Sequence, residues 1–311
     1  MIQNMFIGKI TIVPCSREVY TISTPEKRSS TASIGLASID PNLWRIQKDF
    51  SGKAEMMCKD GNVIANNDFY IPIKLMDTYA YHEIIYGPKP WGMPPFHSKP
   101  IEPILVPETI HTYINLKKVI MYTKFIIDKL DQATNIAYDI WLTREPRYIG
   151  GPKPEDIELM IWIYRASNSE WLPPPAGNKI HEVTISTLID GKVKNAIWDI
   201  WYHPGVSWGG WSYLAYVLTE PSTDVAVDLT EILKQTKRLF REIDPIKHRN
   251  IGQTIENMYV NDIEVGTEVF AYNPGYAGIK WILKEFHIVA YRSDIESTYV
   301  FEHLKNEIIL R

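Results

Sequence analysis

The chain has 311 residues, 45% of them hydrophobic, and a formal net charge of -4. This length suits a single all-β domain with additions at its ends. No run of Lys or Arg exceeds two residues and no apolar segment reaches membrane length, so neither a nucleic acid nor a membrane is expected as a partner.

Residues 1–38 carry little pattern beyond a possible strand at residues 10–13, and we treat them as an extension. Gly8-Lys9 interrupts the first apolar residues, which therefore make no clear signal peptide. Cys15 and Cys58 form no CxxC motif and have no histidine at metal-ligand spacing, so no metal site is expected. A disulfide between them is possible, and the sequence leaves this open.

Short β-type runs recur from Asn42 onward, and turn signals separate them. Strands are expected at residues 55–58, 62–65, 70–75, 84–86, 114–119, 135–143, 158–164, 181–188, 196–202, 213–218, 259–270 and 280–291. Asp190-Gly191 is the strongest hairpin signal. This spacing is typical of a sandwich or a barrel.

One segment has helical periodicity instead. Its apolar side chains recur every 3.6 residues from Leu229 to Ile243, Asp228 and Glu231 form an Asp-x-x-Glu cap, and Pro245 is expected to close it. The tail at residues 293–311 is expected to be a short polar helix or arm.

Residues 157–163 are an apolar run that contains one carboxylate. Alternation along a strand puts Glu158, Met160 and Trp162 on one face and only aliphatic side chains on the other. The aliphatic face predicts core, whereas the other face suits a cleft for a sugar ring. A carboxylate in such a strand is costly unless it is hydrogen-bonded or functional, although an edge strand facing water is an alternative.

Two further acids stand in apolar strands. Glu268 lies in the segment Val-Gly-Thr-Glu-Val-Phe, and Asp139 lies in Ala-Tyr-Asp-Ile-Trp-Leu. A pair of isolated glutamates suits glycoside hydrolysis, in which one carboxyl attacks or activates water and the other protonates the leaving oxygen.

These motifs resemble those of glycoside hydrolase family 12, the small cellulases or endo-β-1,4-glucanases. The resemblance rests on Glu-Leu-Met-Ile-Trp at 158–162, Tyr-Asp-Ile-Trp-Leu at 138–142 and Gly-Thr-Glu at 266–268. Asn-Leu-Trp at 42–44 and Glu-Ile-Ile-Tyr-Gly at 83–87, followed by Pro-Trp-Gly, are also similar to family segments.

The resemblance implies an all-β jelly roll over residues 39–292, a sandwich of two twisted antiparallel sheets with a concave substrate cleft and one outer helix. Glu158 would be the nucleophile of a retaining reaction, Glu268 the acid/base, and Asp139 a hydrogen-bond partner of Glu158. The substrate contacts it implies are Asn42, Trp44, Trp91, Met160 and Trp162, with Trp44 stacking on a sugar at the non-reducing side. No cofactor or metal is expected, the partner is a β-glucan, and the protein is expected to be a monomer.

Two alternatives stay open. A Trp-rich sandwich can be a non-catalytic carbohydrate-binding module, which has no need for two facing glutamates. Within the hydrolase interpretation, cellulose, mixed-linkage β-glucan and xyloglucan are not separated. A polymeric substrate favours an extracellular location, with the cytoplasm as the alternative.

Overall fold

The computed structural model describes residues 5–92, 94, 101–206, 209–247 and 250–306. The strands are β1 (Phe6–Val13), β2 (Val19–Ser23), β3 (Ala32–Ser33), β4 (Ser38–Asp40), β5 (Ser51–Lys59), β6 (Asn62–Ile71), β7 (Asp77–Tyr86), β8 (Glu108–Thr109), β9 (Lys117–Leu130), β10 (Ala133–Thr143), β11 (Ile157–Ser167), β12 (Asn178–Ile189), β13 (Lys192–His203), β14 (Ser212–Leu218), β15 (Asp224–Asp228), β16 (Tyr259–Val260), β17 (Ile263–Ala271), β18 (Gly275–Tyr276) and β19 (Ile279–Arg292). The helices are α1 (Ile110–Asn115), α2 (Leu229–Lys247), α3 (Ile251–Thr254) and α4 (Ser297–Leu304), with a 3₁₀ turn at Ile255–Asn257.

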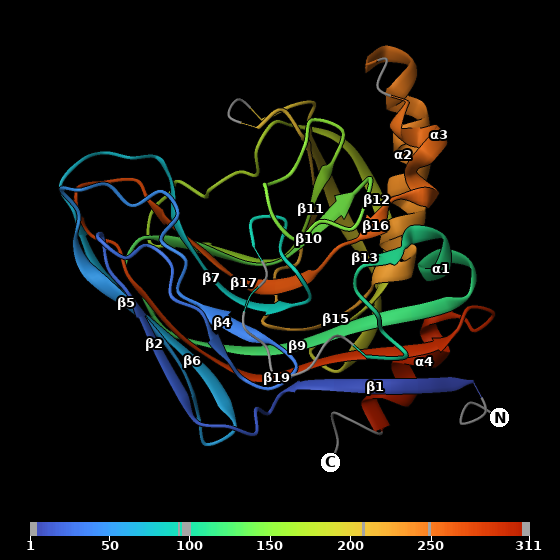
Figure 1. The fold of residues 1–311 in the computed structure, drawn as a ribbon, viewed down its shortest axis with the longest axis horizontal. Coiled ribbons are helices and arrows are strands. Elements are labelled where there is room, and N and C mark those ends of the chain that lie inside the picture. Colours follow the sequence, from blue (N-terminus) through green and yellow to red (C-terminus); the bar gives the residue numbers. More distant parts are fainter. Residues whose placement is uncertain (1–4, 93, 95–100, 207–208, 248–249, 307–311) are drawn as a thin grey trace.

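The strand pairings follow two paths that form the layers of a jelly roll. One path runs β3, β4, β7, β17, β10, β11, β14, β13, β12. The other joins β15, β9 and β19, and from β19 reaches both β1 and β6. Figure 1 shows β9, β19 and β1 side by side in one layer, with β7 and β17 in the other. Pairing of β12 with β15 connects the two paths into one continuous twisted sheet.

The predicted all-β jelly roll is confirmed, but not every pairing is antiparallel. β11 and β14 are parallel, with Leu159 beside Leu214. The chain leaves β11, forms the β12–β13 hairpin, and returns as β14 between β13 and β11. The hairpin turns at Asp190-Gly191, as predicted, and both residues have positive φ angles, 50° and 70°. That geometry matches the twist of the strands.

The two faces of β11 separate as the alternation predicts. Leu159, Ile161 and Ile163 are completely buried in the main core between the layers. Met160 and Trp162 belong to a smaller apolar cluster on the opposite face of the sheet. One strand therefore contributes to the core on one side and leaves its other side for the concave face.

Helix α2 begins as the sequence predicts. The Asp228 carboxylate accepts a hydrogen bond from the backbone N–H of Glu231 at 3.0 Å, which satisfies a donor of the first turn. Leu233 and Phe240 are fully buried against the core. The prediction that Pro245 closes the helix is wrong, because α2 continues to Lys247. A proline removes one backbone donor, and this last turn tolerates the loss.

Two strand predictions are also corrected. The run expected at 70–75 ends as a strand at Ile71, because Pro72 cannot donate to a ladder and Met76 has a positive φ of 55°. The run expected at 114–119 begins inside α1, whose N-cap Thr109 accepts a hydrogen bond from the Thr112 backbone N–H. The threonine cap indicates a helix, which the apolar residues of this run do not reveal by themselves.

The chain ends are tied to the sheet. β1 pairs with β19, β2 pairs with β5, and a disulfide joins Cys15 to Cys58. The bond that the sequence left open is therefore present. At the other end, α4 buries Val300, Phe301 and Leu304, so this part of the tail is an apolar docking helix rather than a polar arm. Of the helices in the described ranges, none combines the length and apolar character needed to cross a bilayer.

Candidate active site

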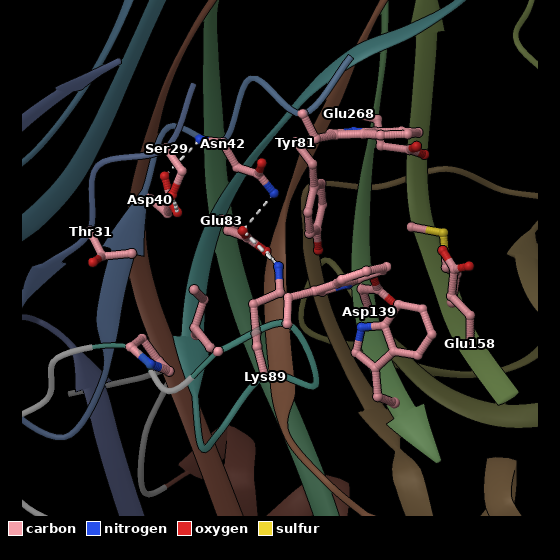
Figure 2. A pocket seen from close by; sticks show the side chains of 17 residues that line it. Ser29, Thr31, Asp40, Asn42, Tyr81, Glu83, Lys89, Asp139, Glu158 and Glu268 are labelled. Atoms are coloured by element: carbon pink, nitrogen blue, oxygen red, sulfur yellow. Dashed lines mark hydrogen bonds and ion pairs between the residues drawn. The ribbon is translucent and has the colours of Figure 1, made fainter. Parts of the chain in front are cut away.

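Three neighbouring strands bring the predicted acids into one cavity of about 510 Å³. Glu268 comes from β17, Asp139 from β10 and Glu158 from β11, and these strands are adjacent in the order β17, β10, β11. Figure 2 shows the three carboxyl groups gathered at one end of the cavity. Its volume is in the range of pockets that hold small molecules or segments of a polymer.

Glu158 is half-buried, and its carboxylate accepts a hydrogen bond of 2.7 Å from the indole N–H of Trp211. Burial raises the pKa of Glu158 to about 7, while the Trp211 hydrogen bond and the positive charge of Lys89 oppose this rise. The two opposing contacts favour the ionised form of a carboxyl that would otherwise stay protonated. Glu158 can therefore become a carboxylate near neutral pH.

Glu268 is held at two points by Asn135. The Asn135 side-chain amide donates to a carboxylate oxygen of Glu268, and its carbonyl oxygen accepts the backbone N–H of Glu268 at 2.9 Å. Burial raises the pKa of Glu268 to about 8, Asn135 lowers it, and the charge of Glu158 raises it. Glu268 therefore keeps its proton at a pH where Glu158 has begun to ionise.

Asp139 lies between these two strands and is 7% exposed. Burial and the charge of Glu158 raise its pKa well above the ordinary value. Within the described ranges, its Oδ1 has no hydrogen-bond partner, and no hydrogen bond joins it to Glu158. In this structure Asp139 and Glu158 therefore interact through their charges and not through the hydrogen bond that the resemblance implies.

The floor of the cavity contains a buried ionic network. The Lys89 ammonium lies 2.8 Å from the Glu83 carboxylate and 3.1 Å from that of Glu264. The Asn42 side-chain amide donates a 2.8 Å hydrogen bond to the same Glu83 carboxylate. Figure 2 shows this chain of contacts crossing the middle of the cavity. Lys89 is the cation that offsets the acidic groups around it.

Four of the five predicted substrate contacts line the cavity: Asn42, Trp44, Trp91 and Met160. Trp91 is half exposed and makes edge contacts with Trp141 and Trp211, at ring-centroid distances of 6.3 and 5.8 Å. The Arg45 guanidinium lies 5.2 Å from the centroid of the Trp44 ring. Flat rings at the rim of a cleft are suited to the faces of sugar rings.

The fifth predicted contact, Trp162, is not among the residues that line this cavity. It is 2% exposed and packs against Phe270, with ring centroids 6.2 Å apart, and its indole N–H points to the Met160 sulfur. Side chains of neighbouring strands cover the Trp162 ring, which is therefore buried in the apolar cluster that also contains Met160. A contact between Trp162 and a substrate stays a prediction.

The sequence analysis did not identify the groups that hold the acids. Trp211 lies 53 positions from Glu158, and Asn135 lies 133 positions from Glu268, so no local pattern links either pair. Asn135 does show one signal, since it is a polar residue inside an apolar strand. Glu83 has the same kind of signal in the stretch that the resemblance already covers, whereas Lys89 follows that strand and stands between two prolines.

Comparison with known proteins agrees with this geometry. The family model described as Glycosyl hydrolase family 12 matches residues 37–295. No curated protein matches the chain at a significant level.

Several solved structures share the fold. The endoglucanase Cel12A from Rhodothermus marinus is 18% identical, with a TM-score of 0.60 over 89% of this chain and 100% of that one. A family 12 xyloglucanase from Bacillus licheniformis is 17% identical, with a TM-score of 0.61 over 88% and 100% of the two chains. Endoglucanase 3 from Trichoderma harzianum is 16% identical, with a TM-score of 0.56 over 87% and 99%. The family match spans the strands that carry all three acids, and the chain is a glycoside hydrolase that belongs to glycosyl hydrolase family 12.

Proposed function

We propose that this protein is an endo-acting β-1,4-glucanase that cleaves its substrate with retention of configuration. Glu158 is the nucleophile and Glu268 the acid/base. The observation that carries the proposal is the pair of half-buried glutamates in one cavity, of which Glu158 accepts the Trp211 indole N–H and Glu268 has a pKa that the charge of Glu158 raises. A reaction that begins with one ionised and one protonated carboxyl requires such a difference between the two groups.

In the first step, a Glu158 carboxylate oxygen bonds to the anomeric carbon while the bond to the glycosidic oxygen breaks. The proton of Glu268 passes to that leaving oxygen. The negative charge on Glu158 is then lost in the ester, so the pKa of Glu268 falls and its carboxylate can accept a proton. In the second step, water attacks the anomeric carbon, Glu268 takes the proton of the water, and Glu158 leaves as a carboxylate.

Asp139 contributes through its charge state. Burial beside Glu158 raises the pKa of Asp139 well above its ordinary value, which favours the protonated form and so limits the negative charge next to the nucleophile. The open cavity and the half-exposed Trp91 at its rim support an attack inside a polymer rather than at its end.

Xyloglucan is the second candidate substrate. The B. licheniformis protein, whose structure is as similar as that of the R. marinus endoglucanase, is a xyloglucanase. Carboxymethylcellulose, barley β-glucan and xyloglucan should therefore be tested together by release of reducing sugar, which ranks the three substrates.

Glu158→Gln tests the nucleophile. We expect turnover to fall by several powers of ten with the fold unchanged, since the amide cannot attack the anomeric carbon. Glu170→Gln is the matched control, because Glu170 is exposed and does not line the cavity. Activity retained by Glu158→Gln would refute the assignment, and NMR of the first-released anomer would refute retention if it showed an α-product.

Glu268→Gln tests the acid/base separately. A nitrophenyl β-cellobioside has a leaving group that needs little protonation, so the first step should survive in this variant while the second slows. We expect an initial burst of nitrophenol equal to the enzyme concentration, followed by slow turnover, and a much larger loss on β-glucan. Equal losses on both substrates, with no burst, would contradict the role of Glu268.

A further inference from the structure

The cavity includes side chains from a part of the chain that precedes the family match. Ser29 and Thr31 lie between β2 and β3, before residue 37 where the match begins, and both line the cavity that holds the acids. Both side chains are exposed. Figure 2 shows them at the end of the cavity opposite Glu158 and Glu268.

Asp40 holds this segment in place. It is 5% exposed, and its Oδ1 accepts the backbone N–H of Ser30 at 3.2 Å and that of Asn42 at 2.9 Å. Its Oδ2 accepts the hydroxyl of Ser29. A single buried carboxylate thus fixes the segment relative to Asn42, one of the predicted sugar contacts. The wall formed by Ser29 and Thr31 is therefore a positioned part of the cleft.

Strand order gives its distance from the reacting groups. Asp40 is on β4, and the path from β4 to β11 crosses β7, β17 and β10. Four steps at the usual strand spacing correspond to about 19 Å across the sheet. Glu268 is on β17, two steps from β4 or about 10 Å, so the bond cleaved between the two glutamates lies about 10–19 Å from Asp40, more than the length of one sugar ring. Through Asn42, the wall lies on the side where the resemblance places the non-reducing part of the chain.

The chemistry of the wall suits sugar hydroxyls. Ser29 donates its proton to Asp40 and keeps lone pairs that can accept, whereas the Thr31 hydroxyl makes no hydrogen bond with the described residues. We propose that Ser29 and Thr31 form an additional subsite at the glycone end of the cleft, which binds the hydroxyl groups of a β-glucan unit more than one position before the cleaved bond. This inference rests on the proposed function, because the cleft must bind a glucan for the subsite to act.

The test compares glycone lengths. Nitrophenyl β-glycosides of two, three, four and five β-1,4-linked glucose units are cleaved by the wild type and by the double variant Ser29→Ala/Thr31→Val, and kcat/KM is measured for nitrophenol release. We expect no difference for the shortest glycoside and a loss of about five- to tenfold once the glycone reaches the wall, the size that one or two neutral hydrogen bonds give.

The control is Ser30→Ala. Ser30 stands between the two proposed contacts, but its hydroxyl accepts from the Lys27 ammonium at 2.7 Å and it does not line the cavity. It should show no dependence on glycone length. An equal loss at all lengths in the double variant would mean a structural role, and no loss at any length would mean that the wall binds no sugar; either result overturns the proposal.

A second readout does not depend on catalysis. Calorimetry with cellohexaose, in a Glu158→Gln background, measures binding with and without the double substitution. We expect a five- to tenfold weaker affinity in the double variant. If the wild type released no product from any glycoside, the proposed function would fail, while equal affinities in this experiment would overturn the subsite on its own.

Discussion

The hydrogen bond from Trp211 to Glu158 provides a sensitive test of the charge balance in the cleft. Trp211→Phe keeps an aromatic ring beside Trp141, whose ring centroid lies 5.2 Å from that of Trp211, and removes the N–H that lies 2.7 Å from the Glu158 carboxylate. Since this donor stabilises the ionised form, its loss raises the pKa of Glu158 further above its ordinary value.

The size of the effect follows from the two glutamates. A hydrogen bond to a charged group contributes about 1.5–3 kcal/mol, which corresponds to about one to two pH units at 1.36 kcal/mol each. In the singly protonated pair this bond favours the form that has its proton on Glu268 over the form that has it on Glu158. Without the Trp211 donor, the ratio of the first form to the second falls by about ten- to a hundredfold, so the reactive fraction of the enzyme decreases.

The assay is the pH dependence of kcat/KM on a soluble β-glucan. Glu158 must be ionised, so the rate falls as the pH decreases through the lower pKa of the pair. In Trp211→Phe the acid limb should therefore move to higher pH, by less than about one unit, because Glu268 then begins to ionise first, at a pKa below about 8 since the Glu158 charge that raises it is absent.

Trp141→Phe is the control for the loss of indole volume. Trp141 lines the same cavity, and its buried indole N–H has no hydrogen-bond partner within the described ranges. This variant should leave the acid limb in place even if its rate changes. An acid limb that stays at the same pH in both variants, or moves to lower pH in Trp211→Phe, would refute the argument.

Two further predictions concern stability. The disulfide closes a loop between residues 43 positions apart, so Cys15→Ser/Cys58→Ser should lower the free energy of unfolding by about 4 kcal/mol in a denaturant titration, and a loss below about 1 kcal/mol would contradict a role in stability. Lys89→Met removes the cation between Glu83 and Glu264, and burial raises the pKa values of these two carboxyls. The substitution should lower the free energy of unfolding by about 3–5 kcal/mol at pH 8. The cost should be smaller at pH 5, where the folded protein can keep these carboxyls protonated; an equal cost at both pH values would contradict the electrostatic explanation.

The sequence predicted those features that depend on alternation along one strand. In β11 the separation of Leu159 and Ile161 from Glu158 and Met160 follows directly from period 2, and the structure confirms it. An acid in an apolar strand also stands out without any knowledge of its neighbours, because burial of an unpaired charge is costly. Both patterns depend only on residues within one strand, so they can be recognised before the neighbours of that strand are known.

The sequence could not predict which side chains support the acids. The contact of Trp211 with Glu158 depends on the parallel pairing of β11 with β14, a neighbour relation that forms only after the β12–β13 hairpin has been placed. The same holds for Asn135, which reaches Glu268 across the β10–β17 pair. Such contacts are set by the order and register of strands, which one sequence leaves undetermined.

The cleft needs one negative charge at the reacting pair, and the buried groups around it make this state accessible near neutral pH. Lys89 is held by two carboxylates, Glu83 and Glu264, and burial raises the pKa values of both, so this network stays close to neutral overall. Burial also raises the pKa of Asp139 well above its ordinary value, whereas the Trp211 hydrogen bond and Lys89 lower that of Glu158. Since the Trp211 hydrogen bond lowers the pKa of Glu158, a change at that bond should alter the pH profile more than the stability of the fold.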